Sequence, residues 1–155
     1  MQVINTYLTA DTFLMPYYES HPLWSSCDAS SGMTYTRAQA STKLGGGDAR
    51  QVDTADSDDG DSYSFYVLLP AGTYTFDCIR SRNTTLATVD MSIDGSVFGT
   101  FVGNDAGAAS NIVSTVTGIV VSTAGLYTLK FQANGTAGTD YQMVIYWFSF
   151  TRTGA

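Results

Sequence analysis

The sequence predicts an all-β protein, an antiparallel and jelly-roll-like β-sandwich. Two similar segments, Ala71–Asp77 and Ala124–Lys130, each place a glycine turn directly before a strand with alternating side chains. After Gly60, strand-length segments and turn signals recur about every eight to twelve residues, as they do in sandwiches. The composition agrees, since ten Tyr and eight Phe accompany only 14% charged residues and aromatic residues favour strands. We find no segment with the pattern of a helix of three turns.

The expected strands follow one another from residue 62 towards the C-terminus. In Ser62–Leu69, four apolar residues share one face, namely Tyr63, Phe65, Val67 and Leu69. Asp94-Gly95 is a typical hairpin turn. The other expected strands are Thr73–Arg80, Leu86–Asp94, Val97–Val102, Ile112–Val121, Leu126–Ala133 and Tyr141–Thr151.

The length of 155 residues predicts one domain, in which we distinguish three regions. Residues 1–24 are apolar and aromatic, and their prolines oppose a helix, so we expect an extended arm. Residues 25–61 are polar and are expected to form long loops, with one short strand at Met33–Thr36. Residues 62–155 form the core of the sandwich.

The last expected strand is apolar on both faces. Strict alternation puts Val144, Tyr146, Phe148 and Phe150 on one face. A half-exposed strand would be polar on its other face, so both faces must be covered, the second either by the arm or by a neighbouring subunit. The predicted interface consists of Tyr141, Met143, Ile145 and Trp147 on this strand, together with Phe13, Tyr17 and Tyr18 of the arm.

The charge of the chain limits its partners. Seven basic and 14 acidic residues give a formal net charge of -7, which disfavours binding to nucleic acid and to anionic membranes. The N-terminus has no signal peptide pattern, and no apolar run is long enough to span a membrane. We therefore expect a protein that is made in a cytoplasm.

The residues needed for catalysis are missing, so we predict no enzyme and no catalytic or cofactor-binding residue. His21 is the single histidine, and neither it nor nearby Cys27 has the partners of a nucleophilic triad. Glu19 is the single glutamate, and no carboxylate pair suits glycoside hydrolysis. A disulfide between Cys27 and Cys78 is possible, but Cys78 is in phase with the apolar residues of its strand, which favours a free core thiol.

An acidic segment offers oxygen ligands of the kind that Ca²⁺ prefers. Its spacing is not that of an EF-hand, because Gly60 comes one place early and Val67 stands where a bidentate Glu belongs. Two interpretations of this segment remain, an irregular calcium site and a solvated turn that binds no metal. We expect no other metal. The calcium candidates are Asp56, Asp58, Asp59 and Asp61, with Asp53 nearby.

Aromatic residues near the expected loops offer a second possibility. Trp24 and Tyr35, with Tyr17 and Tyr18, could stack on sugar rings. The alternative is that they pack within the chain or between chains.

Several segments resemble jelly-roll sandwiches of two related kinds. One kind is the non-catalytic carbohydrate-binding module attached to glycoside hydrolases, and the other is the small sandwich at the ends of phage fibres and on phage capsids. The resemblance covers about residues 60–151 and implies the fold more than the role. It rests on Gly60–Ser62, Leu69–Phe76, Val89–Gly95, Ala124–Leu129 and Ile145–Phe150.

The doubly apolar last strand and the missing signal favour the phage kind. We expect a non-enzymatic virion structural protein, a homotrimeric capsid decoration or cement protein that stabilises the phage head. Its partners would be further copies of itself and the major capsid protein or another virion protein, after assembly in the host cytoplasm. The alternative is a carbohydrate-binding or receptor-binding sandwich, a fibre tip or a carbohydrate-binding module, with a glycan as its partner.

Overall fold

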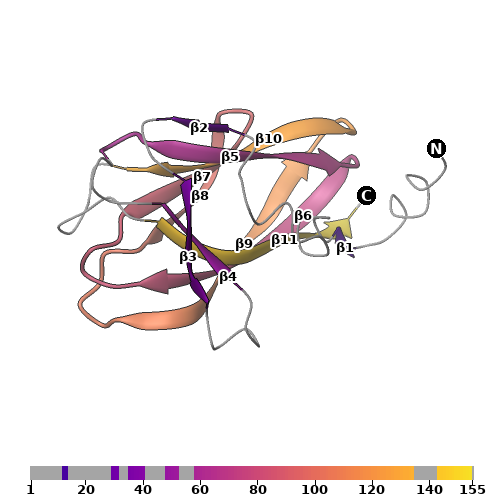
Figure 1. The fold of residues 1–155 in the computed structure, drawn as a ribbon. Helices are drawn as coiled ribbons and strands as arrows, with labels where there is room; N and C mark the ends of the chain where they lie inside the picture. The colour runs from indigo at the N-terminus through magenta and orange to yellow at the C-terminus, as the bar shows by residue number, and fades with distance from the viewer. Residues whose placement is uncertain are drawn as a thin grey trace.

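The computed structural model describes residues 12–13, 29–31, 35–40, 48–52, 58–134 and 143–154, with side chains for 58–109, 112–134, 143–145 and 148–154. These residues form two antiparallel sheets packed face to face (Figure 1). The predicted all-β sandwich is therefore confirmed. The described residues include no helix, and so none that is able to cross a membrane.

The two sheets have different strand orders. Sheet A has the order β3-β4-β11-β6-β9, with β1 also pairing with β11, and sheet B has the order β2-β5-β10-β7-β8. The strands of sheet A are β1 (Thr12–Phe13), β3 (Tyr35–Ala40), β4 (Asp48–Val52), β6 (Gly72–Arg82), β9 (Ala109–Val121) and β11 (Met143–Gly154). The strands of sheet B are β2 (Ala29–Ser31), β5 (Ser62–Leu69), β7 (Thr88–Ile93), β8 (Ser96–Val102) and β10 (Gly125–Ala133).

The strands expected between residues 62 and 151 are confirmed as β5 to β11, with small differences at their ends. The short strand expected at Met33–Thr36 overlaps the start of β3, but the expectation of loops in the rest of residues 25–61 is wrong where the region contributes β2, β4 and the remainder of β3. β2 pairs with β5, and β4 pairs with β11. Backbone pairing satisfies the N–H and C=O groups of polar residues as well as those of apolar ones, whereas side-chain alternation reveals a strand only where one face is buried.

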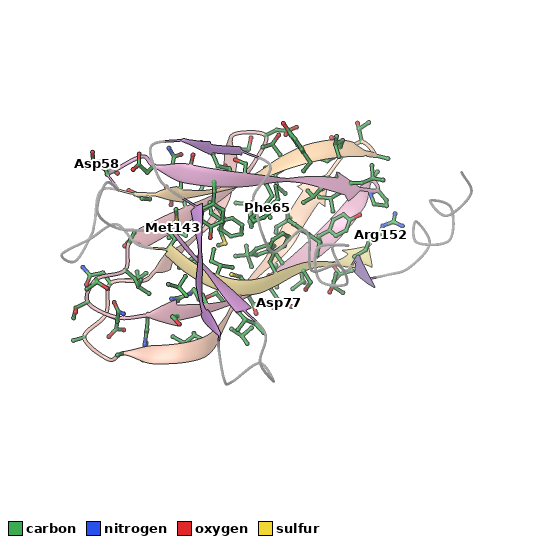
Figure 2. All side chains as sticks on the ribbon, in the orientation of Figure 1. Asp58, Phe65, Asp77, Met143 and Arg152 are labelled. Atoms are coloured by element: carbon green, nitrogen blue, oxygen red, sulfur yellow. The ribbon has the colours of Figure 1, made fainter. Side chains whose placement is uncertain are left out.

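The core between the sheets is largely aromatic. The four inward residues of β5 are buried, as predicted. Phe65 meets Phe148 of β11 with ring centroids 5.4 Å apart, and Phe76 of β6 meets Phe150 at 5.0 Å. Figure 2 shows Phe65 between the two layers, whereas Asp58 lies at one end of the molecule. Each such buried side chain contributes about 1.5–3 kcal/mol.

A β-bulge in β11 resets which of its residues face the core. Ile145 pairs with Arg80 of β6, but Trp147 pairs with the adjacent Ile79, so β11 contains one extra residue at this point. A bulge of this kind shifts the alternation by one place. As a result, four residues from both sides of the bulge lie in the same core, namely Met143, Ile145, Phe148 and Phe150.

The predicted interface role of Met143 and Ile145 is therefore wrong. Their side chains are 1% and 3% exposed and are covered by their own chain. Strict alternation across the bulge placed Met143 and Ile145 on the face opposite to Phe148 and Phe150, whereas all four side chains lie in one core. Tyr141, Tyr17 and Tyr18 lie outside the described residues. The structure describes the backbones of Phe13, which pairs with Phe150 through β1, and of Trp147.

The edge strands β8 and β9 lie next to each other and form a seam between the two sheets. In the middle of the seam, Gly99 allows the backbone of β8 to approach β9. A Cβ atom at Gly99 would lie 2.7 Å from Cγ2 of Val116 and 3.1 Å from Cε of Met91. A larger residue at this position would therefore separate the two edges.

Arg80 closes one end of this seam. Its Nε donates a hydrogen bond of 2.7 Å to Oγ of Ser114 on β9, and its Nη1 donates one of 3.0 Å to the carbonyl of Val102 on β8. The guanidinium carbon lies 4.4 Å from the ring centroid of Phe101, in the range of a cation–π contact. Burial lowers the pKa of Arg80, but an arginine still keeps its charge. One side chain thus joins both sheets.

Cys78 is a free thiol that is completely buried in the core, as predicted. Burial raises the pKa of Cys78 to about 12. Since the thiolate is the reactive form, Cys78 is an inert core residue at neutral pH. Cys27 lies outside the described residues.

The bulge in β11 predicts losses of stability of different size for substitutions at two neighbouring residues. Ile145→Ala should lower the free energy of unfolding by about 2–5 kcal/mol, because it opens a cavity in the core. Val144→Ala, on the other side of the strand, should cost about 1 kcal/mol or less. Urea unfolding followed by tryptophan fluorescence measures both. A larger loss for Val144→Ala than for Ile145→Ala would contradict the assigned phase of the strand.

The contacts at the seam predict that replacing Arg80 lowers the free energy of unfolding more than replacing a second arginine, Arg82. Arg80→Met should cost about 2 kcal/mol or more, because it leaves the partly buried oxygen atoms of Ser114 and Val102 without their donor. Arg82 is partly exposed and forms an ion pair of 3.0 Å with Asp105. Arg82→Met should cost about 1 kcal/mol or less, as is usual for exposed pairs. Equal losses of unfolding free energy for the two variants would show that Arg80 does not hold the seam.

Candidate functional site

The seam opens into a groove at the end away from Arg80. The groove has a volume of about 500 Å³. The two edge strands, the turn between β7 and β8, and β10 all contribute to it. Its lining residues are Ile93, Asp94, Ser96, Val97, Phe98, Thr117, Gly118, Ile119, Val120, Val121, Ser122 and Tyr127.

Aromatic side chains from the margin of the core contribute to the floor of the groove. Phe98 is half-buried, and its ring lies 5.2 Å from that of Phe76 in an edge-to-face arrangement and 6.3 Å from that of Phe150. Tyr127 is also half-buried against the core, and its hydroxyl donates a hydrogen bond to the carbonyl of Thr123. Both rings are therefore held in place by the fold before any ligand binds.

A second β-bulge, in β9, shapes the wall of the groove. Val116 pairs with Phe76, but Ile119 pairs with Tyr74, so β9 contains one extra residue between them. Gly118 lies in this bulge with φ +76°, and a Cβ atom there would meet nothing within 4 Å. The bulge returns Ile119 to the core and leaves Thr117 exposed at the groove.

The rim of the groove is polar and carries one carboxylate. Asp94 has φ +47°; its backbone N–H donates to the carbonyl of Thr128 at 3.0 Å, and its Oδ1 accepts from the Thr128 N–H at 2.8 Å. Hydroxyl groups of the lining complete the rim, from Ser96, Thr117 and Ser122. The described lining contains neither Lys, Arg nor His. Such a site can donate and accept hydrogen bonds, but it lacks the second carboxylate that glycoside hydrolysis requires.

The acidic candidates for calcium form a turn at the opposite end of the molecule. Oδ2 of Asp61 accepts a hydrogen bond of 2.6 Å from the backbone N–H of Asp58, and the Asp61 N–H donates to the Asp58 carbonyl at 3.2 Å. Gly60 has φ +92°, as at the third position of a type II turn. Within the described residues, Asp58, Asp59 and Asp61 do not form a cluster of three possible metal ligands. Asp53 and Asp56 lie outside those residues.

The sequence did not identify the residues of the groove as a site. Trp24 and His21 lie outside the described residues, and Tyr35 belongs to β3, at the edge of sheet A opposite to β9. Phe98 and Tyr127 looked like ordinary strand residues. Gly118 within an apolar strand was the available signal, because a glycine inside a strand often marks a bulge.

No protein-family model matches the chain, and the search of curated proteins finds no relative. Solved structures with a similar fold include carbohydrate-binding modules. One is the CBM36-1 domain of a multidomain xylanase from the hindgut metagenome of Trinervitermes trinervoides, with 20% identity, a TM-score of 0.57, and 84% of this chain and 94% of that chain covered.

A family 6 carbohydrate-binding module from Clostridium cellulolyticum, in complex with xylose, has 17% identity and a TM-score of 0.57, over 83% of this chain and 93% of that one. A CBM36 module in complex with calcium and xylotriose has 19% identity and a TM-score of 0.57, over 79% and 92%. At such low sequence identity, the structural similarity to these modules establishes the fold of this chain and nothing more. The jelly-roll-like sandwich is confirmed, and the three neighbours described here are carbohydrate-binding modules.

Proposed function

We propose that this chain is a non-enzymatic carbohydrate-binding β-sandwich that holds a segment of a neutral polysaccharide in the seam groove. One observation carries the proposal. The half-buried rings of Phe98 and Tyr127 lie in a groove whose rim bears hydroxyl groups and one carboxylate.

This combination of groups suits a sugar. A sugar ring has apolar C–H faces and a rim of hydroxyl groups, so it needs an apolar surface and nearby hydrogen-bond partners. Binding sites generally combine a largely apolar lining with a few placed polar groups. Asp94 and the net charge of -7 repel acidic sugars, which favours a neutral chain.

The structural neighbours support the same function. Their descriptions name xylose and xylotriose as bound sugars, so a xylan-type oligosaccharide is the first ligand to test. One neighbour is in complex with calcium as well. Binding should therefore be measured both with calcium and with a chelator.

The virion prediction loses part of its support, because two of the four residues in its predicted strand interface lie in the core. It depended on a second apolar face of the last strand, and the bulge places Met143 and Ile145 in the core instead. The carbohydrate-binding alternative needs no such face. A groove of this kind would serve a module beside an enzyme and a fibre tip that recognises a surface glycan.

Two tyrosines provide a matched test of the groove. Tyr127→Ala should weaken binding of xylotriose by at least about tenfold, which corresponds to about 1.4 kcal/mol, because it removes an aromatic surface of the groove. Tyr66 is 54% exposed on β5, away from the groove, so Tyr66→Ala should leave the affinity unchanged. Isothermal titration calorimetry with the wild type and both variants measures the difference.

The control is the urea midpoint of each variant, which must show that the protein is folded in the titration. Loss of binding in Tyr66→Ala but not in Tyr127→Ala would indicate that the sugar binds to the exposed face of sheet B and not to the groove. Absence of binding by the wild type to a panel of neutral oligosaccharides, with and without calcium, would contradict the proposal.

A further inference from the structure

Asp94 carries the one charged side chain in the described lining of the groove, and the fold holds it in a fixed position. Asp94 and Gly95 have φ values of +47° and +82°, as in the type I′ turn of a two-residue hairpin. The Asp94 N–H donates to the Thr128 carbonyl at 3.0 Å, and Oδ1 accepts from the Thr128 N–H at 2.8 Å. These two bonds to one residue of β10 fix both the turn and the carboxylate.

Only one oxygen atom of this carboxylate has a partner within the described residues. Oδ1 is bonded to Thr128, whereas Oδ2 makes no hydrogen bond or ion pair with any described residue. Asp94 is exposed, so Oδ2 is accessible to a ligand. At neutral pH a carboxylate accepts hydrogen bonds and donates none. Its partner in a ligand must therefore be a donor, and the donors of a neutral oligosaccharide are its hydroxyl groups.

The backbone that anchors Asp94 also positions an aromatic surface. Thr128 directly follows Tyr127 on β10. The ring of Tyr127 is half-buried, and its hydroxyl is bonded to the Thr123 carbonyl. One segment thus holds the ring and the carboxylate. A sugar ring that packs a C–H face on Tyr127 has its hydroxyl groups at its edge, and the rim of the groove provides Asp94 as an acceptor for them.

We propose that Asp94 determines the specificity of the groove, because its Oδ2 accepts a hydrogen bond from a free hydroxyl group of the bound sugar. This inference rests on the proposed function and narrows the ligand to an unsubstituted neutral oligosaccharide. An acetyl or methyl group on that hydroxyl removes the donor and leaves the carboxylate without a partner. A hydrogen bond to a charged group is about twice as strong as one between neutral groups. Asp94 therefore discriminates more strongly than Ser96 or Thr117.

Asp94→Asn tests the role of Oδ2. Asparagine keeps an oxygen atom for the Thr128 N–H and tolerates a positive φ, but it replaces Oδ2 by an NH₂ group, which donates. In calorimetry with a chelator present, the affinity for xylotriose should fall at least about tenfold. Asp58→Asn is the matched control and should bind like the wild type, because it removes the same charge at the other end of the molecule (Figure 2).

A modified ligand separates recognition from a general loss of stability. Fully O-methylated xylotriose has no hydroxyl donor, so the wild type should bind it at least about tenfold more weakly than xylotriose. This ratio of affinities should shrink in Asp94→Asn, because the variant lacks the acceptor that responds to the donor. A variant that is merely less stable would bind both ligands more weakly and keep the ratio.

The outcomes distinguish this inference from the proposed function. A wild type that binds xylotriose no better than Asp94→Asn does, or that binds the methylated ligand equally well, overturns the inference alone. An unchanged ratio in Asp94→Asn overturns it too. An effect of the substitution that appears only with calcium also overturns it, because the carboxylate would then hold a cation. A wild type that binds no neutral oligosaccharide overturns both.

Discussion

The pleat of a β-strand sends successive side chains to opposite faces, and several β-bulges in this fold reset that alternation, two of which place apolar residues in the core. In β11, one extra residue between Ile145 and Trp147 keeps the large side chains on both sides of the bulge in one core. In β9, the bulge at Gly118 returns Ile119 to the interior. Without these two resets, apolar residues of both strands would face water, at a cost of about 1.5–3 kcal/mol for each large side chain.

The bulge in β9 also creates the candidate site. The seam between β8 and β9 is held together by Arg80 at one end and by the close approach at Gly99 in the middle. Beyond this point the bulge turns β9, and the two edges separate into the groove. Phe98 is fixed there by the aromatic core. A site that is formed in advance loses little conformational entropy when a ligand binds.

The sequence predicted the layers of the fold better than the site. Residues such as Phe65 and Val67 alternate regularly with polar neighbours, so their burial could be predicted from period alone. The strands within residues 25–61 show no such alternation of apolar and polar residues. Backbone pairing holds their polar residues in the sheets, and it leaves no pattern in the sequence. The bulge in β11 could not be predicted either, because a single extra residue leaves no signal in a strand whose residues are nearly all apolar. Phe98 and Tyr127 owe their position to the separation of two edges that are distant in sequence.

The central claim is that the seam groove binds a neutral oligosaccharide. Amide-resolved NMR during a titration with xylotriose tests this claim most directly. The account predicts that the largest shift changes occur at Phe98, Gly118 and Tyr127, with small changes at Tyr66 and around Asp58. Changes confined to the face of sheet B or to the acidic turn, while the amides of the groove stay unmoved, would contradict it.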